Sequence, residues 1–258
     1  MNSIRENSLS PLSLDGWTWN PFFEDMINQI SIFEFEEYPI PDKFLYNKVL
    51  SKSLNDLGEI KISTWACKFN KIKQARAACL HGGKSFSVFN LVIHPFSNYN
   101  LPFFGADLVT LPNGYLLALD LQPALKNDSF HTQDVWELLK PLHHKWQSML
   151  PFGGEIPKEA KPFFSPGFLW TRLPLDKSTD LIIDEVIRPA FKDYLSLYIK
   201  LLKNAERVSD DISLKILDGQ ISYLNYRSTK DPARAMLSRF YGKEWTEEYI
   251  HKVLFNPY

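Results

Sequence analysis

The first half of the chain alternates between hydrophobic and polar positions, a pattern that predicts β-strands. The segment from about 30 to 69 reads as extended, with its clearest alternation at 60–69. Three more strands are predicted at 85–94, 103–111 and 115–121. Pro112, Asn113 and Gly114 separate the last two strands, and we expect a tight hairpin there because Asn and Gly both tolerate positive φ.

The second half of the chain changes to the periodicity of amphipathic helices. Helices are predicted over 134–149, 180–204, 209–226 and 244–254, with a loop or short helix at 158–168. Pro189 either kinks the second helix or marks a boundary just before it. Asp231 and Pro232 are expected to open a further helix, as its N-cap and its first residue. Residues 1–20 are polar and turn-rich, and we expect them to lie over the surface.

Strands followed by helices, with hairpins rather than crossovers, indicate an α+β sandwich on a mainly antiparallel sheet. No linker, repeat or low-complexity segment interrupts the 258 residues, so one domain spanning 1–258 is expected.

The net charge of -1 argues against general nucleic-acid binding. Cys67 and Cys79 fit a reducing compartment, and we find no membrane span, signal peptide or transit peptide. A soluble intracellular protein is therefore expected.

Basic residues are concentrated in one stretch of the sequence. Between Glu59 and Asp107 there is no acidic residue, although the chain contains 30 Asp and Glu in total. The same window contains six basic residues: Lys61, Lys68, Lys71, Lys73, Arg76 and Lys84. Such a cluster suits an anionic ligand or an acidic protein partner, and an ordinary solvated strand face is the alternative.

Asp107 is a solitary carboxyl inside an apolar strand. Alternation puts it on one face with Phe103, Gly105 and Val109. Burial without a cation would raise its pKa toward neutrality, so that it could hold and donate a proton. The alternative is an Asp at a bulge that bonds its own backbone. Asn90, in the middle of the preceding strand, needs partners that either a polar ligand or a neighbouring strand could supply.

A second cluster of charged residues occupies 226–234. Asp231 reads first as a helix cap, yet Arg227 lies four residues before it. Arg227 and Lys230 could hold ligand carboxylates, with bidentate geometry available to the arginine. Familiar cofactor motifs are absent from the sequence: there is no G-x-G-x-x-G, no H-E-x-x-H and no G-x-S-x-G, and the P-loop pattern before Lys84 lacks its first glycine.

Four segments carry a resemblance to a known family. The stretches 103–112, 116–123, 162–172 and 226–234, followed by the tail 242–250, resemble the ferredoxin-dependent bilin reductases over about 17–255. Within that family they are most similar to enzymes that convert 15,16-dihydrobiliverdin to phycoerythrobilin. The sister enzyme that first reduces biliverdin has Leu-Asp-Phe-Gln-Pro where this chain has Leu-Asp-Leu-Gln-Pro at 119–123.

The resemblance implies a three-layer α/β/α sandwich that encloses an open-chain tetrapyrrole. It implies no bound metal or organic cofactor, because the substrate radical accepts electrons singly from reduced ferredoxin. The implied reaction is two-electron reduction of the A-ring diene system of 15,16-dihydrobiliverdin. Asp107 and Asp231 match the proton donors, and Asn90 matches a position that is His in the phycocyanobilin-forming relative. Arg227 matches a residue beside the bilin, and Arg172 is a candidate for binding its propionates.

The resemblance also implies partners. Ferredoxin is expected to dock on the basic window 61–84, and the upstream bilin reductase is a candidate for substrate channelling. We expect a monomer in a cyanobacterial-type cytoplasm, or in a plastid stroma after removal of a transit peptide. Two alternatives remain open, namely a sister reductase that makes 15,16-dihydrobiliverdin from biliverdin and a bilin carrier without catalysis. Two carboxyls on opposite walls of a pocket favour an enzyme.

Overall fold

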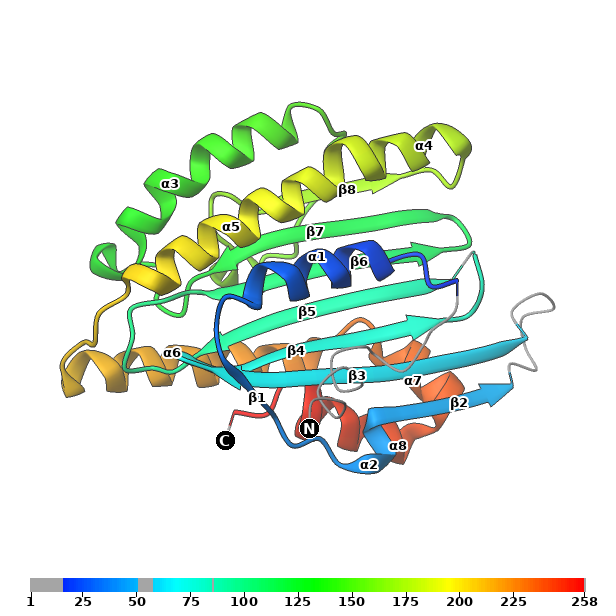
Figure 1. The fold of residues 1–258 in the computed structure, drawn as a ribbon, viewed down its shortest axis with the longest axis horizontal. Coiled ribbons are helices and arrows are strands. Elements are labelled where there is room, and N and C mark those ends of the chain that lie inside the picture. The colour runs from blue at the N-terminus through cyan, green and yellow to red at the C-terminus, as the bar shows by residue number, and fades with distance from the viewer. Residues whose placement is uncertain (1–15, 51–57, 85, 258) are drawn as a thin grey trace, which may run out of the picture.

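The computed structural model describes residues 16–50, 58–84 and 86–257, and within them an eight-stranded sheet forms the centre of the molecule (Figure 1). The sheet order is β1-β3-β4-β5-β6-β7-β8, with β2 also paired to β3, and every pair is antiparallel. The strands are β1 (Phe35–Glu37), β2 (Tyr46–Leu50), β3 (Glu59–Phe69), β4 (Ile72–His81), β5 (Ser87–Pro95), β6 (Phe103–Leu111), β7 (Gly114–Gln122) and β8 (Leu169–Leu173).

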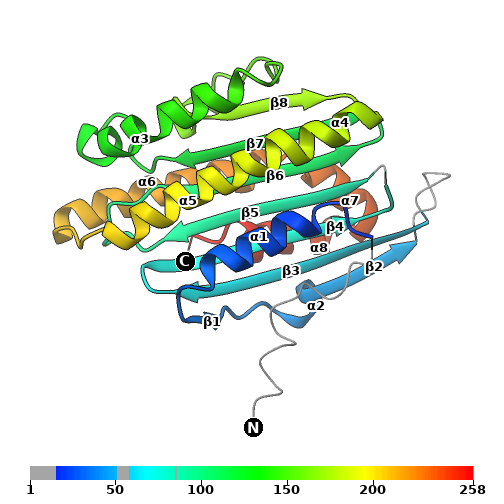
Figure 2. The same cartoon turned by 45° about the horizontal axis from the view of Figure 1, so that its top comes forward.

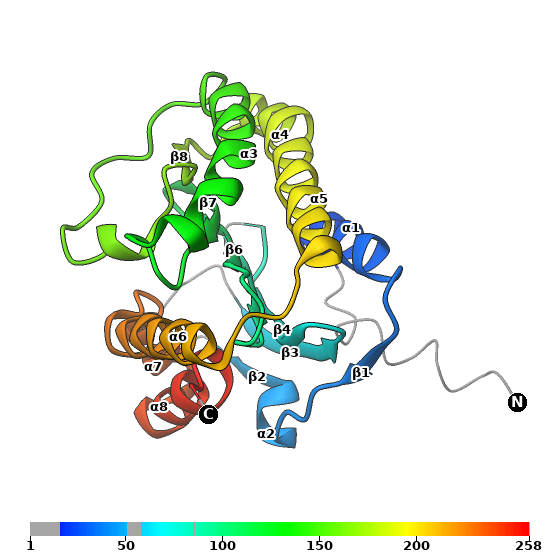
Figure 3. The same cartoon turned by 90° about the vertical axis from the view of Figure 1, so that its left-hand side faces the viewer.

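Helices cover both faces of this sheet, as the side view shows (Figure 3). One face carries α1 (Asn20–Ile30), α3 (Ser129–Gln147), α4 (Lys177–Ile182) and α5 (Arg188–Asn204), which lie in front of the sheet in Figure 2. The other face carries α6 (Asp210–Lys230), α7 (Arg234–Tyr241) and α8 (Lys243–Tyr249), with a short α2 (Asp42–Leu45) before β2. The predicted three-layer α/β/α sandwich on an antiparallel sheet is confirmed.

The alternation along β6 divides its side chains between two cores. Phe104, Ala106 and Leu108 are buried in the core that α1, α3 and α5 cover. Phe103 points the other way and packs in the second core, where its ring lies 4.7 Å from that of Tyr223 in α6. Asp107 shares the Phe103 face, because every second residue of a strand points to the same side. The predicted strand therefore presents Asp107 to α6, α7 and α8.

Two strands of the sheet have no counterpart in the sequence prediction. β4 contains three alanines together with Lys, Gln and Arg, which favour helices as readily as strands, so its alternation is weak. β8 is only five residues long and follows a Pro-rich segment. The structure places β4 inside the sheet, paired with β3 on one side and β5 on the other, and this cross-strand pairing outweighs local preference. The region 30–69 also contains α2 as well as strands.

The beginning of the described chain differs from the prediction. Trp17 and Trp19 are 4% and 0% exposed, and their indole N–H groups donate to the carbonyls of Leu80 and Ser87. α1 follows directly, although no helix is predicted there. The expectation that 1–20 lies over the surface is therefore wrong for the two tryptophans, and residues 1–15 lie outside the described residues.

Prolines shape two other connections. The predicted helix over 180–204 is α4, a π-helical turn at Ile183–Ile187 and α5, so the widened turn directly precedes Pro189. In the hairpin between β6 and β7, Pro112 and Asn113 form the turn, and Gly114 has the positive φ of 134°. A Cβ at Gly114 would lie 2.3 Å from the Leu173 carbonyl oxygen, so glycine is required both because there is no room for a side chain and because φ is positive.

Candidate active site

A two-lobed cavity lies between the sheet and the C-terminal helices. The large lobe has a volume of about 680 Å³ and the small lobe about 410 Å³, sizes typical of ligand sites. The lining residues common to both lobes are Asn90, Asp107, Leu116, Arg227 and Pro232. The lobes therefore meet at the polar residues that the sequence singles out.

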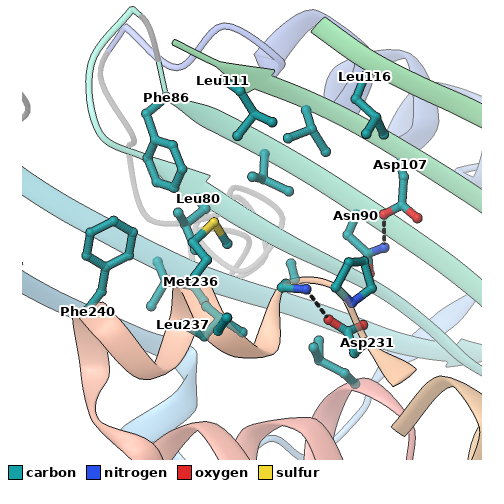
Figure 4. Close-up of a pocket in the computed structure, with 18 of the residues that line it drawn as sticks. Leu80, Phe86, Asn90, Asp107, Leu111, Leu116, Asp231, Met236, Leu237 and Phe240 are labelled. Carbon is teal, nitrogen blue, oxygen red and sulfur yellow. Dashed lines mark hydrogen bonds between the residues drawn. The ribbon is translucent and has the colours of Figure 1, made fainter. Parts of the chain in front are cut away.

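The large lobe has mainly apolar walls. Leu80, Phe86 and Leu111 line it from the sheet side, and Met236 and Phe240 line it from α7 (Figure 4). Such walls suit flat, apolar rings rather than a small hydrophilic ligand.

The small lobe is rich in aromatic rings and has exposed cations at its edge. Phe163 stacks on Tyr226 with ring centroids 4.6 Å apart, and Phe164 stacks on Phe168 at 4.1 Å. Arg172 and Lys230 also line this lobe, and both are exposed. The guanidinium of Arg172 lies 5.4 Å from the ring centroid of Trp170. Stacking surface and cations together suit a planar, anionic ligand.

The sheet side of the junction is formed by Asn90 and Asp107, which are directly opposite each other in the β5–β6 pair. Asn90 Nδ2 donates to Asp107 Oδ1, the contact drawn in Figure 4. On its other side Asn90 Oδ1 accepts from Nη1 of Arg76 at 2.6 Å. The partners of the Asn90 amide thus come from neighbouring strands, which was one of the two alternatives. The Asp107 side chain is 32% exposed and reaches the cavity.

On the helical side, Asp231 lines the large lobe next to Pro232, which lines both lobes. The predicted N-cap is wrong, because α6 continues to Lys230 and α7 begins only at Arg234, leaving Asp231 at the end of α6. Its Oδ1 still accepts a hydrogen bond from the Ala233 N–H at 2.8 Å. Its side chain is 5% exposed, and burial raises the pKa of this carboxyl, with Arg227 and the Ala233 amide acting in the opposite direction. A raised pKa suits a proton donor.

Arg227 lies between the two carboxylates. Its Nη2 is 3.7 Å from Oδ2 of Asp107 and 3.7 Å from Oδ2 of Asp231. The second distance follows from α6, because residues four apart lie on one face of a helix. Burial opposes its charge, but Tyr223 and the two carboxylates outweigh burial and raise the pKa of the guanidinium. The structure thus brings together the four predicted residues Asp107, Asp231, Asn90 and Arg227, and it places a cation beside Asp107.

The basic window does not form one cationic face. Lys61 and Lys68 pair with Glu59 and Glu36, at opposite ends of β3. The ammonium of Lys71 donates to carbonyls at the C-terminal end of α5. Arg76 is fully buried beside the cavity. Residues that are close in the sequence here lie along two strands and alternate between the two faces of the sheet, so their charges are spread out. Docking of ferredoxin on 61–84 stays a prediction.

Several buried polar residues at the site, Arg76, Asp120 and Gln122 among them, have no counterpart among the predicted site residues, and two of these concern us here. One is Arg76, which shares a face of β4 with the lining residues Ala78 and Leu80, although no strand is predicted there. The other is Asp120, which lines the small lobe and accepts hydrogen bonds from the hydroxyl and the N–H of Ser165. Burial raises the pKa of Asp120 to about 7, and the bonds from Ser165 act against it. Asp120 thereby fastens the segment that carries Phe163, Phe164 and Phe168 to the sheet.

The described residues contain no group of three or more His, Cys, Asp or Glu that could hold a metal ion. Within the same ranges, no helix combines the length and the apolar character needed to cross a membrane. Cys67 and Cys79 are both buried free thiols.

Comparison with known families agrees with this architecture. The family model described as ferredoxin-dependent bilin reductase matches residues 23–256, so the chain belongs to the ferredoxin-dependent bilin reductases. These are oxidoreductases that take their electrons from ferredoxin. The chain is similar to a phycoerythrobilin:ferredoxin oxidoreductase from Prochlorococcus marinus, with 63% identity over 98% of both chains. It is also similar to an enzyme of the same name from a Synechococcus strain, with 53% identity over 99% of this chain and 100% of the relative.

A solved structure has the same fold at lower identity. It is the crystal structure of phytochromobilin synthase from tomato in complex with biliverdin. The TM-score is 0.81 with 24% sequence identity, covering 93% of this chain and 83% of the tomato protein.

Proposed function

We propose that this bilin reductase converts 15,16-dihydrobiliverdin to phycoerythrobilin. The relatives at 52–63% identity over nearly their full length carry the name of that activity, which supports the choice within the family. The reduction adds two electrons and two protons to the A-ring diene system. Two reduced ferredoxins supply the electrons one at a time, so the bilin passes through a radical. The chain itself must supply the bilin site and the protons.

One observation supports the protein's part in this chemistry above all others. Asp107 on the sheet and Asp231 on the helical side both lie within 3.7 Å of the same guanidinium nitrogen of Arg227, where the two lobes meet. A bilin that spans this junction would have one carboxyl on each side of its plane. We propose that Asp107 and Asp231 each deliver one proton, while Arg227 holds whichever carboxylate has lost its proton.

The cavity supports a bilin as the ligand. The apolar walls of the large lobe and the aromatic stacks of the small lobe suit conjugated pyrrole rings. Arg172 and Lys230 at the edge of the small lobe are proposed to bind the propionates. Cyanobacterial relatives favour the cytoplasm over a plastid stroma as the place of the reaction. A monomeric single domain, docking of ferredoxin and transfer of substrate from an upstream bilin reductase remain part of the proposal.

Anaerobic turnover with reduced ferredoxin tests this function. Either 15,16-dihydrobiliverdin or biliverdin is supplied, absorbance is followed, and the products are separated by chromatography. We expect phycoerythrobilin from 15,16-dihydrobiliverdin and no efficient reduction of biliverdin. Preferential reduction of biliverdin would instead identify the sister reductase. A bilin spectrum that stays unchanged under reduced ferredoxin would identify a carrier.

A further inference from the structure

Arg76 is a fully buried cation whose role is not explained by a neighbouring acid. It lies in the middle of β4 with 0% exposure, and its side chain shares a face with cavity-lining Ala78. Among the described residues no carboxylate forms an ion pair with it, and its buried Nε has no hydrogen-bond partner. Burial lowers the pKa of the guanidinium. Burying a charge without an ion pair is unfavourable, so a specific use for it is expected.

Two of the three hydrogen bonds that Arg76 donates go to Asn90. Its Nη1 donates to Asn90 Oδ1 at 2.6 Å and to the Asn90 carbonyl oxygen at 3.3 Å, while Nη2 donates to the Leu254 carbonyl oxygen at 3.4 Å. A guanidinium has no acceptor atom. The oxygen of the Asn90 amide must therefore face Arg76, and its NH₂ group must face Asp107. Arg76 thus prevents the Asn90 amide from flipping.

The orientation of Asn90 decides how Asp107 can carry a proton. Asn90 Nδ2 donates to Oδ1 of Asp107, so Oδ1 is an acceptor in both protonation states. The acid proton then belongs on Oδ2, the oxygen that faces Arg227 at the junction of the lobes. With a flipped amide, Asn90 Oδ1 would accept the proton of Asp107 and draw it away from the cavity.

We propose that Arg76 is a positioning residue that fixes the Asn90 amide and thereby directs the acid proton of Asp107 toward the bilin. This inference rests on the proposed function of Asp107 as a proton donor. It assigns no contact between Arg76 and the bilin, since Arg76 acts through Asn90.

A double-mutant cycle on the full-length protein tests the proposal. Arg76→Met removes the donors with little change of length, Arg76→Lys keeps one cationic donor, and Asn90→Ala removes the amide. Binding of 15,16-dihydrobiliverdin is measured by absorbance, and the rate of its reduction is measured in anaerobic single turnover from pH 6 to 9. We expect Arg76→Met to change bilin affinity less than about threefold and to slow reduction about 10²-fold, as misplacement of a reacting group does. Arg76→Lys should recover much of the rate.

The cycle separates positioning from a merely structural role. In the Asn90→Ala background, Arg76→Met should cause no further slowing, because the amide through which Arg76 acts is already absent. Slowing by the same factor in both backgrounds, or weaker binding with an unchanged rate, would overturn the proposal. If Arg76→Met does not fold, as its melting temperature would show, Arg76→Leu, which also has no donor, replaces it with the same expectation of slower turnover.

A measurement without turnover keeps this test distinct from that of the proposed function. In NMR of the ¹⁵N-labelled protein, the side-chain amide protons of Asn90 should be protected from exchange, and Arg76→Met should remove that protection. Unchanged protection would contradict the proposal that Arg76 fixes the Asn90 amide, whatever the substrate is. If the wild-type protein forms no phycoerythrobilin but its Asn90 amide protons are protected in an Arg76-dependent way, only the proposed function is contradicted.

Discussion

Arg227 and Asp107 face each other across the junction of the two lobes, with Nη2 of the arginine 3.7 Å from Oδ2 of the carboxylate. The same nitrogen is equally far from Oδ2 of Asp231. At this separation the guanidinium stabilises negative charge on both groups without closing a tight ion pair on either.

Replacement of Arg227 by Met should shift the pH dependence of turnover. Arg227 lowers the pKa of Asp231 against the effect of burial, so its removal should raise that pKa and keep the Asp231 carboxyl protonated to higher pH. Since the reaction uses the protonated acids, the alkaline limb of the rate should move up by about one pH unit. Arg227→Lys, which keeps a positive charge, should shift the limb less. An unchanged limb in Arg227→Met would show that this cation does not tune the acids.

Asp231→Ser should separate local structure from chemistry. A serine hydroxyl can still accept the hydrogen bond that the Ala233 N–H donates to Asp231, so the free energy of unfolding should change by less than about 1 kcal/mol. The acidic proton is lost, and phycoerythrobilin should be suppressed or replaced by another isomer. Melting temperature and product profile are measured on the same sample. A normal product profile would leave Asp231 with only its role in the turn.

Sequence patterns could predict the strands that carry Asn90 and Asp107, because both alternate clearly between two faces. Alternation also places Asp107 on the face of Phe103, where the cavity lies. The spacing of Arg227 and Asp231 indicates one helical face only if the helix reaches residue 230, and the predicted helix ended at 226. The expectation that a helix starts at Asp231 hid the continuation of α6 to Lys230. An Asp followed by Pro can stand either at the start of a helix or just after the end of one.

Arg76 and Asp120 were beyond local sequence patterns for a different reason. β4 reads as helix or strand equally well, so the face on which Arg76 lies is known only once the pairing of β4 with β5 is known. Asp120 is explained by Ser165, which lies 45 residues away in the sequence. The sequence also could not show that the basic residues of 61–84 are spread apart. Lys68 contacts Glu36 and Lys71 contacts α5, and both contacts join segments that are distant in the sequence.

Asp120→Asn should make stability less dependent on pH. The pKa of Asp120 is raised from 3.8 to about 7, so between those values the folded state holds a proton that the unfolded state has lost. In wild type this carboxyl therefore lowers the free energy of unfolding as pH rises from about 4 to 7. The amide of Asn does not titrate, and its oxygen can accept the Ser165 N–H while its NH₂ group donates to the Ser165 hydroxyl oxygen. The stability of Asp120→Asn relative to wild type should therefore rise over that window by on the order of 2–4 kcal/mol. Denaturant unfolding at several pH values measures this, and a constant difference would contradict it.

Arg172→Ala and Lys230→Ala should weaken bilin binding and leave the rate of reduction nearly unchanged. Both cations are exposed at the edge of the small lobe, so each contact with a propionate should contribute about 0.5–1 kcal/mol, or two- to fivefold in Kd. Arg239→Ala is the matched control, because Arg239 is an exposed cation that lines the large lobe. Equal weakening by Arg239→Ala would mean that the propionates do not select the small lobe.

The most direct test of proton delivery by the site is anaerobic single turnover of Asp107→Asn. Asn preserves the shape of the carboxyl but cannot act as an acid, and loss of a general acid typically slows a reaction by about 10²–10⁴. Bilin affinity should stay close to that of wild type. Upon addition of reduced ferredoxin, absorbance and electron paramagnetic resonance should then show a bilin radical that accumulates and decays slowly, with little phycoerythrobilin. Phycoerythrobilin formed at the wild-type rate, without a persistent radical, would contradict the role of Asp107.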